Sequence, residues 1–158
     1  SVRENLEFPL IRNFNFTPKE RETKIKTVLE NVSLEEAIDK MPSELSGGMK
    51  KRIGLARSII AEPKLMLYDE PTTGLDPITS KEISSLILEL QKSLKMTSIV
   101  VTHDLLCAEI IADRAIVLNE GIVQYEGTIP ELTSSLDPFL RNFFSHEIIE
   151  EQNRSTNE

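Results

Sequence analysis

The sequence has a single cysteine, no tryptophan and few aromatic residues, and these shortages exclude several classes of protein. One thiol, Cys107, can form neither an intramolecular disulfide nor a cysteine metal site, which suits a reducing compartment and favours a cytosolic location. No apolar run approaches the roughly 20 residues that a membrane-spanning helix needs. The opening residues SVRENLEFPL are neither a signal peptide nor a transit peptide. Any contact with a membrane is therefore expected to pass through a partner.

Basic residues are also in deficit: 18 Lys and Arg stand against 26 Asp and Glu, which gives a formal net charge of -8. A nucleic-acid-binding surface needs clustered positive charge, and the short run Lys50-Lys51-Arg52 is better interpreted as a solvated helix face. We therefore expect no nucleic-acid partner. A length of 158 residues, with 39% hydrophobic and 28% charged residues, is typical of one globular domain.

Serine or threonine followed three positions later by glutamate is the spacing of a capping box, and it marks several predicted helix starts. The clearest is Thr17, which Pro18 and Glu20 follow, and it predicts a helix to about Val32. The spacing recurs at 33–36, 79–82 and 128–131, and an Asp-Pro pair at 137–138 predicts one more start. After position 79 the apolar residues recur at helical spacing and predict one buried face: Ile83, Leu86, Ile87, Leu90 and Leu94.

Short apolar runs separate these helices. Leu65 to Tyr68 and Ser98 to Val101 are continuous, which predicts strands buried on both faces of a parallel sheet. The alternation of strand and helix through residues 65–112 predicts an α/β fold with βαβ winding. Residues 115–118 and 122–125 flank an Asn-Glu-Gly turn and predict a hairpin.

Asp69 and Glu70 follow directly on the first predicted strand, at its carboxyl end, where open α/β sheets place their ligands. One carboxylate there can hold Mg²⁺ through its water shell, and its neighbour can orient or deprotonate a water for phosphoryl transfer. Taken alone, the pair is also what a solvated turn ahead of Pro71 would contain.

Ser46, Gly47 and Gly48 precede a predicted helix, and two glycines leave backbone N–H groups unobstructed at its N-terminus. Such a helix end favours a phosphate, although an ordinary serine N-cap has the same residues. His103 and Asp104 follow the second predicted strand. A lone histidine is more often structural than functional, so this position is open on the residues alone.

Together these motifs resemble the ATPase subunit of ABC transporters. LSGGMKKRIGLARSI is similar to the signature helix, LMLYDE to Walker B with the catalytic glutamate, TTGLDP to the D-loop and VVTHD to the histidine switch. The resemblance covers nearly the whole chain. It implies an α/β fold, namely part of the P-loop NTPase core together with part of the helical subdomain of this family.

The resemblance also implies roles for single residues. Asp69 would take the Mg²⁺ shell, Glu70 would act on the attacking water, and His103 would contact the γ-phosphate of ATP. Ser46, Gly47 and Gly48 would meet the γ-phosphate of ATP held by a second copy. Asp76 would link the two sites.

The cofactors implied are ATP and Mg²⁺, and the partners are a second ATPase subunit and transmembrane permease subunits. The permease is expected to dock against the helical segment between Phe8 and Leu45. The implied location is the cytoplasmic face of the inner membrane.

Within the family, the wording FPL, LSGGMKKR, YDEPTTGLDPITS and DPFLRNFF resembles the branch that serves MCE/Mla-type phospholipid transporters. Met49 stands where most members have Gln, which removes a side-chain amide from the signature. Two other functions stay open. These are a degenerate, non-catalytic ABC-like binding or regulatory module, and a soluble ABC ATPase without a transport role.

Glycine is scarce, and none of the 6 glycines begins a G-x-x-x-x-G-K-[ST] loop, the element that cradles the phosphates of ATP. The Q-loop glutamine is missing as well. We expect a carboxyl-terminal fragment that hydrolyses no ATP alone and is marginally stable, because the missing strand would leave backbone groups unpaired. The expected division is residues 1–45 as part of the helical subdomain, 46–146 as the carboxyl-terminal half of the ATPase core, and 147–158 as a disordered polar tail.

Overall fold

The computed structural model describes residues 1–144 and divides the chain into two compact units, Ser1–Val101 and Thr102–Glu158. The predicted boundary at residue 45 stays a prediction, and the predicted tail 147–158 lies outside the described residues. No helix in the described part of the chain is both long and apolar enough to cross a bilayer.

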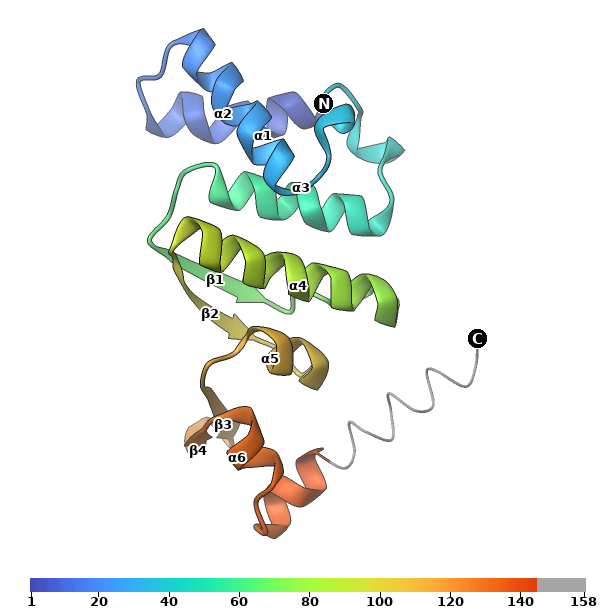
Figure 1. Cartoon of the computed structure of the whole chain (residues 1–158), viewed down its shortest axis with the longest axis vertical. Helices are drawn as coiled ribbons and strands as arrows, with labels where there is room; N and C mark the ends of the chain where they lie inside the picture. The colour runs from blue at the N-terminus through green and yellow to red at the C-terminus, as the bar shows by residue number, and fades with distance from the viewer. Residues whose placement is uncertain (145–158) are drawn as a thin grey trace. The chain divides into compact units, whose positions relative to one another are not determined.

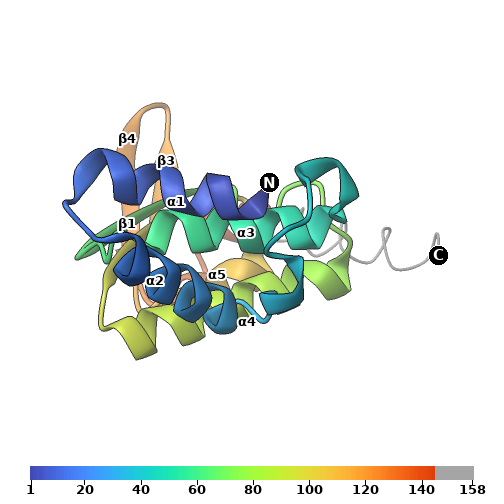
Figure 2. The same ribbon diagram turned by 90° about the horizontal axis from the view of Figure 1, so that it is seen from above.

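The first unit begins with a layer of helices. α1 (Val2–Asn13) and α2 (Pro18–Asn31) pack on each other and on α3 (Gly47–Ile59), as both views show (Figure 1, Figure 2). Two short 3₁₀ turns, Glu35–Ala37 and Pro42–Glu44, connect α2 to α3. The centre of this layer consists of fully buried aliphatic side chains: Leu6, Leu10, Ile25 and Leu29.

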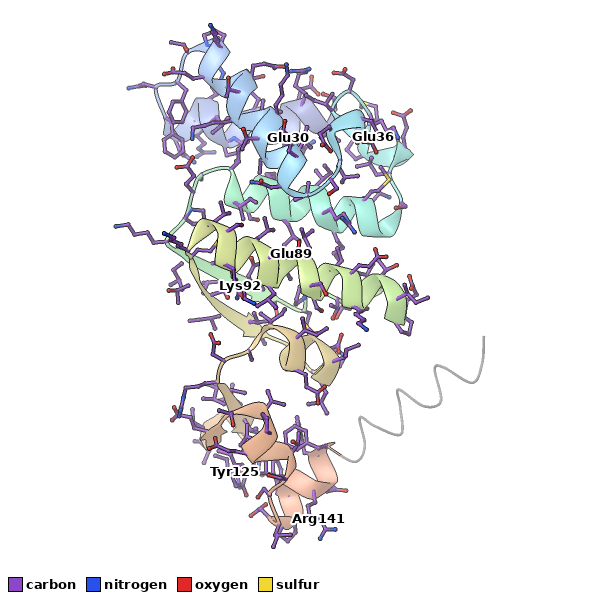
Figure 3. The ribbon with its side chains drawn as sticks, in the orientation of Figure 1. Glu30, Glu36, Glu89, Lys92, Tyr125 and Arg141 are labelled. Carbon is purple, nitrogen blue, oxygen red and sulfur yellow. The ribbon has the colours of Figure 1, made fainter. Side chains whose placement is uncertain are left out.

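Below the helices lies a two-stranded parallel sheet, β1 (Leu65–Asp69) beside β2 (Thr97–Val101), joined through α4 (Pro77–Leu94). This confirms the predicted βαβ winding. α4 lies across the strands in Figure 1, and its Gln91 amide donates to the Ser98 hydroxyl on the covered face. The outward face of α4 carries Glu89 and Lys92 (Figure 3).

The prediction that both strands are buried on both faces is wrong for the described residues. Burial alternates along β1, so that Met66 and Tyr68 are buried while Leu67 is 69% exposed. The register pairs Leu67 with Ile99, which is exposed on the same side. The physical reason is that α4 covers one side of this sheet and, among the described elements of the first unit, none covers the opposite side.

Two of the predicted helix starts are also corrected. α2 does begin after Thr17, whose side chain closes the expected capping box with Glu20. The helix predicted from Thr79 begins three residues earlier, because Asp76 is its N-cap and accepts the backbone N–H of Thr79. No capping box forms at Ser33, which has a φ of 54° and lies in the turn before the 3₁₀ segment.

The second unit contains α5 (Leu105–Ile111), the antiparallel hairpin β3 (Ala115–Asn119) and β4 (Ile122–Gly127), α6 (Ile129–Thr133) and a helix over 138–144. The predicted hairpin is confirmed. The Tyr125 ring stacks on Phe139, so that the hairpin is packed against the last described helix (Figure 3). Four buried residues form the centre of the unit: Val117, Leu132, Leu140 and Phe144.

Candidate functional site

The N-terminus of α3 is one half of the candidate site. Ser46 is its N-cap, and its hydroxyl accepts the backbone N–H of Met49 at 3.2 Å. Gly47 and Gly48 are the first two helical residues, and Ser46 and Gly47 are exposed. The first N–H groups of a helix lack partners within the helix and carry the positive end of its dipole. This helix end can therefore receive an anion as well as serve as an ordinary cap.

Gly48 lies against the first turn of α4. A Cβ built on Gly48 would lie 3.0 Å from the Cγ2 atom of Thr79, which is closer than carbon atoms normally approach. Absence of a side chain at position 48 therefore allows the starts of α3 and α4 to come together. Sequence motifs give no signal for such an approach, because the two residues are far apart in the chain.

Asp76 is held at the start of α4. Its carboxylate accepts the backbone N–H of Thr79 at 2.9 Å and the hydroxyl of the same residue. These two hydrogen bonds, the one from the hydroxyl first, keep the pKa of Asp76 below its ordinary value. The turn that leads to Asp76 passes through Gly74, which has a φ of 81° that a residue with a side chain adopts only at a cost.

An open pocket of about 390 Å³ lies between these two helix starts. It brings together four of the predicted site residues: Ser46, Gly47, Gly48 and Asp76. Arg52 and Glu82 also line it, and their side chains form an ion pair with an N–O distance of 3.2 Å. The pocket thus combines a helix N-terminus with charged groups of both signs.

The two adjacent carboxylates lie outside the lining of this pocket, at the end of β1. Asp69 is the last residue of the strand, is exposed and pairs with Val101 of β2. Glu70 donates its backbone N–H to the Val101 carbonyl at 2.9 Å, and its carboxylate accepts the Thr73 hydroxyl at 3.1 Å. The φ of Glu70 is 47°, a left-handed conformation that costs a non-glycine residue on the order of 1 kcal/mol. The fold therefore holds this glutamate in an unfavourable backbone conformation.

The Asp69–Glu70 pair fits a Mg²⁺ ion that is bound together with phosphate. No group of three His, Cys, Asp or Glu residues within 1–144 is arranged to hold a metal ion. Magnesium commonly uses only one or two carboxylates, with water and phosphate oxygens as its other ligands. The residues present thus suit an ion that arrives with a phosphate ligand, and not a site made of protein groups alone.

His103 belongs to the second unit, two residues after the end of β2, and is exposed. The next residue, Asp104, is the N-cap of α5 and accepts the N–H of Cys107 at 3.0 Å. Thr102 accepts the N–H of Asp104 at 3.0 Å. A role for His103 beside Asp69 and Glu70 stays a prediction.

The chain is similar to known proteins in both sequence and structure. Residues 1–73 match the family model described as ABC transporter. The methionine import ATP-binding protein MetN of Streptococcus mutans is 36% identical over 135 residues, which are 85% of this chain and 38% of that protein. MetN of Streptococcus pyogenes matches at the same identity and coverage. The chain thus spans well under half the length of these curated relatives.

Solved structures give the same result. CbiO1 of Clostridium perfringens, part of the ABC transporter complex CbiONQ, has a TM-score of 0.78 at 33% identity and covers 97% of this chain and 57% of its own. An ATP-binding cassette in a dimeric, post-hydrolysis state with bound ADP and Pi has a TM-score of 0.69 at 33% identity, over 82% of this chain and 56% of its own. The chain therefore has the α/β fold of the ABC ATPases and is similar in sequence to the ATP-binding domains of ABC transporters.

Proposed function

We propose that the chain is part of an ATP-binding and ATP-hydrolysing subunit of an ABC transporter. The observation that carries the proposal is the pocket in which the helix end at Ser46, Gly47 and Gly48 meets Asp76. A glycine-lined helix N-terminus suits a phosphate, and it is solvent-accessible here. A pair of carboxylates at the carboxyl end of β1 adds the groups that phosphoryl transfer to water needs.

The residue roles in this proposal are those that the resemblance to ABC transporter ATPases implies. Asp69 would hold Mg²⁺, which neutralises charge on phosphate oxygens when it is bound. Glu70 would orient the attacking water and accept its proton, and its hydrogen bond with Thr73 and its fixed backbone limit where its carboxylate can lie. The N–H groups of Gly47 and Gly48 would bind the terminal phosphate of ATP held by a second copy. Asp76 would connect the two sites, and His103 would contact the γ-phosphate of the ATP held by its own copy.

Two further parts of the proposal concern partners and organisation. Permease subunits would dock on the helical layer, where Phe8 and Ile11 of α1 are 61% and 59% exposed. Such exposed apolar side chains are typical of a surface that a partner covers. The subunit would then work on the cytoplasmic face of a membrane. We also propose residues 1–45 as part of the helical subdomain and 46–146 as part of the ATPase core.

The test replaces Glu70 with Gln in the full subunit, assembled with its partners. Hydrolysis should fall at least about 100-fold, since a positioned general base contributes about that much or more, while ATP binding is retained. Glu89→Gln is the matched control, because Glu89 is exposed on the outward face of α4. Hydrolysis by Glu70→Gln at the rate of the parent would reject the mechanism.

The cargo is a separate question with two candidates. The motif wording FPL, LSGGMKKR and DPITS supports a phospholipid cargo, whereas the curated relatives are named for methionine import. Reconstituted vesicles separate the two. ATP-dependent movement of labelled phospholipid, without uptake of labelled methionine, supports the phospholipid proposal, and the opposite result rejects it.

A further inference from the structure

Thr79 touches both of the motifs that meet in the pocket. Its hydroxyl and its backbone N–H both donate to the Asp76 carboxylate, one to each oxygen atom. Its Cγ2 methyl group lies 3.0 Å from the point that the Cβ of a larger residue at position 48 would occupy. Thr79 is half-buried and lines the pocket together with Gly48 and Asp76.

Both branches of the Thr79 side chain are engaged, the hydroxyl with Asp76 and the methyl group with position 48. Two heavy atoms on Cβ leave a helical threonine few rotamers, so a rotamer that places the hydroxyl on Asp76 also decides where the methyl group points. The Asp76 carboxylate is exposed, and without the hydroxyl only backbone N–H groups at the start of α4 would restrain it. One side chain therefore couples the orientation of Asp76 to the spacing between α3 and α4.

We propose that Thr79 is a positioning residue for ATP hydrolysis, which orients the Asp76 carboxylate and sets its separation from Gly48. The hydroxyl orients the Asp76 carboxylate, and the methyl group sets the separation from Gly48. The inference rests on the function proposed above, because it assumes that Asp76 and Gly48 act on nucleotide.

Thr79→Val and Thr79→Ser separate the two tasks. Valine keeps the branched shape against Gly48 and removes the hydroxyl, whereas serine keeps the hydroxyl and removes the methyl group. In the assembled, full subunit we expect Thr79→Val to lower kcat about tenfold with less than about a twofold change in KM, since a hydrogen bond to a charged group is lost. Thr79→Ser should retain kcat within about threefold. Thr133→Val is the matched control, because the Thr133 hydroxyl only donates to backbone carbonyls of α6.

A double-mutant cycle with Asp76→Ala tests whether Thr79 acts through Asp76. If it does, Thr79→Val has no further effect on kcat once Asp76 is replaced. Effects that multiply would overturn the proposal, and so would a normal kcat for Thr79→Val beside a low kcat for Asp76→Ala. If Asp76→Ala leaves kcat unchanged, the role proposed for Asp76 is wrong and Thr79 has nothing to position.

A readout without catalysis keeps the two proposals distinguishable. The carboxyl pKa of Asp76 can be followed by NMR in protein labelled with ¹³C-aspartate. Thr79→Val should raise this pKa towards the ordinary value, and Thr79→Ser should leave it in place. An equal pKa in all three proteins would reject the positioning role even if the subunit hydrolyses ATP. The expected shift in a subunit that hydrolyses no ATP would support the geometry and reject the function.

Discussion

The guanidinium of Arg52, on α3, lies 3.2 Å from the carboxylate of Glu82, on α4, and also donates to the Val32 carbonyl at 3.3 Å. Val32 caps the end of α2, so that one side chain ties three helices together at the pocket. The Arg52 side chain is 25% exposed and that of Glu82 is 56% exposed. Replacement of Arg52 is therefore expected to lower the free energy of unfolding more than replacement of Glu82.

Replacement of Arg52 by Ala should lower the free energy of unfolding by about 1–2 kcal/mol, because it breaks both contacts and removes half-buried stem packing. Glu82→Ala should cost less than about 1 kcal/mol, as for other exposed ion pairs. Urea unfolding of both single variants and the double variant gives the coupling energy. We expect it to shrink as salt is added, and a Glu82→Ala loss equal to that of Arg52→Ala would contradict the assignment.

Ala at position 48 should strain the contact between α3 and α4, because its Cβ would meet Thr79 at 3.0 Å. Overpacking of this kind costs about 1–3 kcal/mol. The strain should be relieved in the Gly48→Ala/Thr79→Ser double variant, whose position 79 lacks the offending methyl group. Thermal unfolding of the three proteins measures this.

Gly54 supplies the control on the same helix. A Cβ at this position meets nothing within 4 Å, so Gly54→Ala should stabilise the chain by about 0.5–1 kcal/mol through the higher helix propensity of Ala. If the Gly48→Ala/Thr79→Ser double variant is no more stable than Gly48→Ala alone, the Thr79 methyl group is not the source of the strain.

Asp76 should make the stability of α4 depend on pH. Hydrogen bonds from Thr79 lower its pKa in the folded chain, so its contribution is fully present above the ordinary pKa and is lost as pH falls through the lowered value. Asn at this position caps a helix nearly as well but does not titrate. The melting temperature of the parent should exceed that of Asp76→Asn at about pH 6, and the difference should vanish at about pH 2. A difference that grows on acidification would contradict this sign.

Loss of an apolar side chain should destabilise the chain on the side of the sheet that α4 covers, and have little effect on the exposed side. Ile87 of α4 is fully buried, and Ile87→Ala should cost about 2–5 kcal/mol because it leaves a cavity. Leu67 is 69% exposed, and Leu67→Ala should change the free energy of unfolding by less than about 0.5 kcal/mol in this chain. Comparable losses from the two variants, measured by denaturant titration, would mean that the Leu67 face is covered in solution.

Local patterns predicted most elements well, because capping and periodicity depend on residues a few positions apart. The capping box at Thr17 and the apolar runs that became β1 and β2 are examples. The same logic supplied no prediction for α1, where Ser1 and Glu4 close a capping box but the interior Pro9 argues against a helix. It failed at Asp76, where an aspartate and not Thr79 begins α4.

Of the candidate site, the sequence by itself determined the residue types and their order: a glycine-flanked helix start, two carboxylates after an apolar strand, and an aspartate before a proline. These follow from chain-local chemistry. Only the tertiary structure decided that Gly48 lies against Thr79, that Asp76 joins the signature residues in one pocket, and that one face of the sheet is exposed. The reason is physical, since each of these depends on how segments some 30 residues apart pack, and no local pattern encodes that distance.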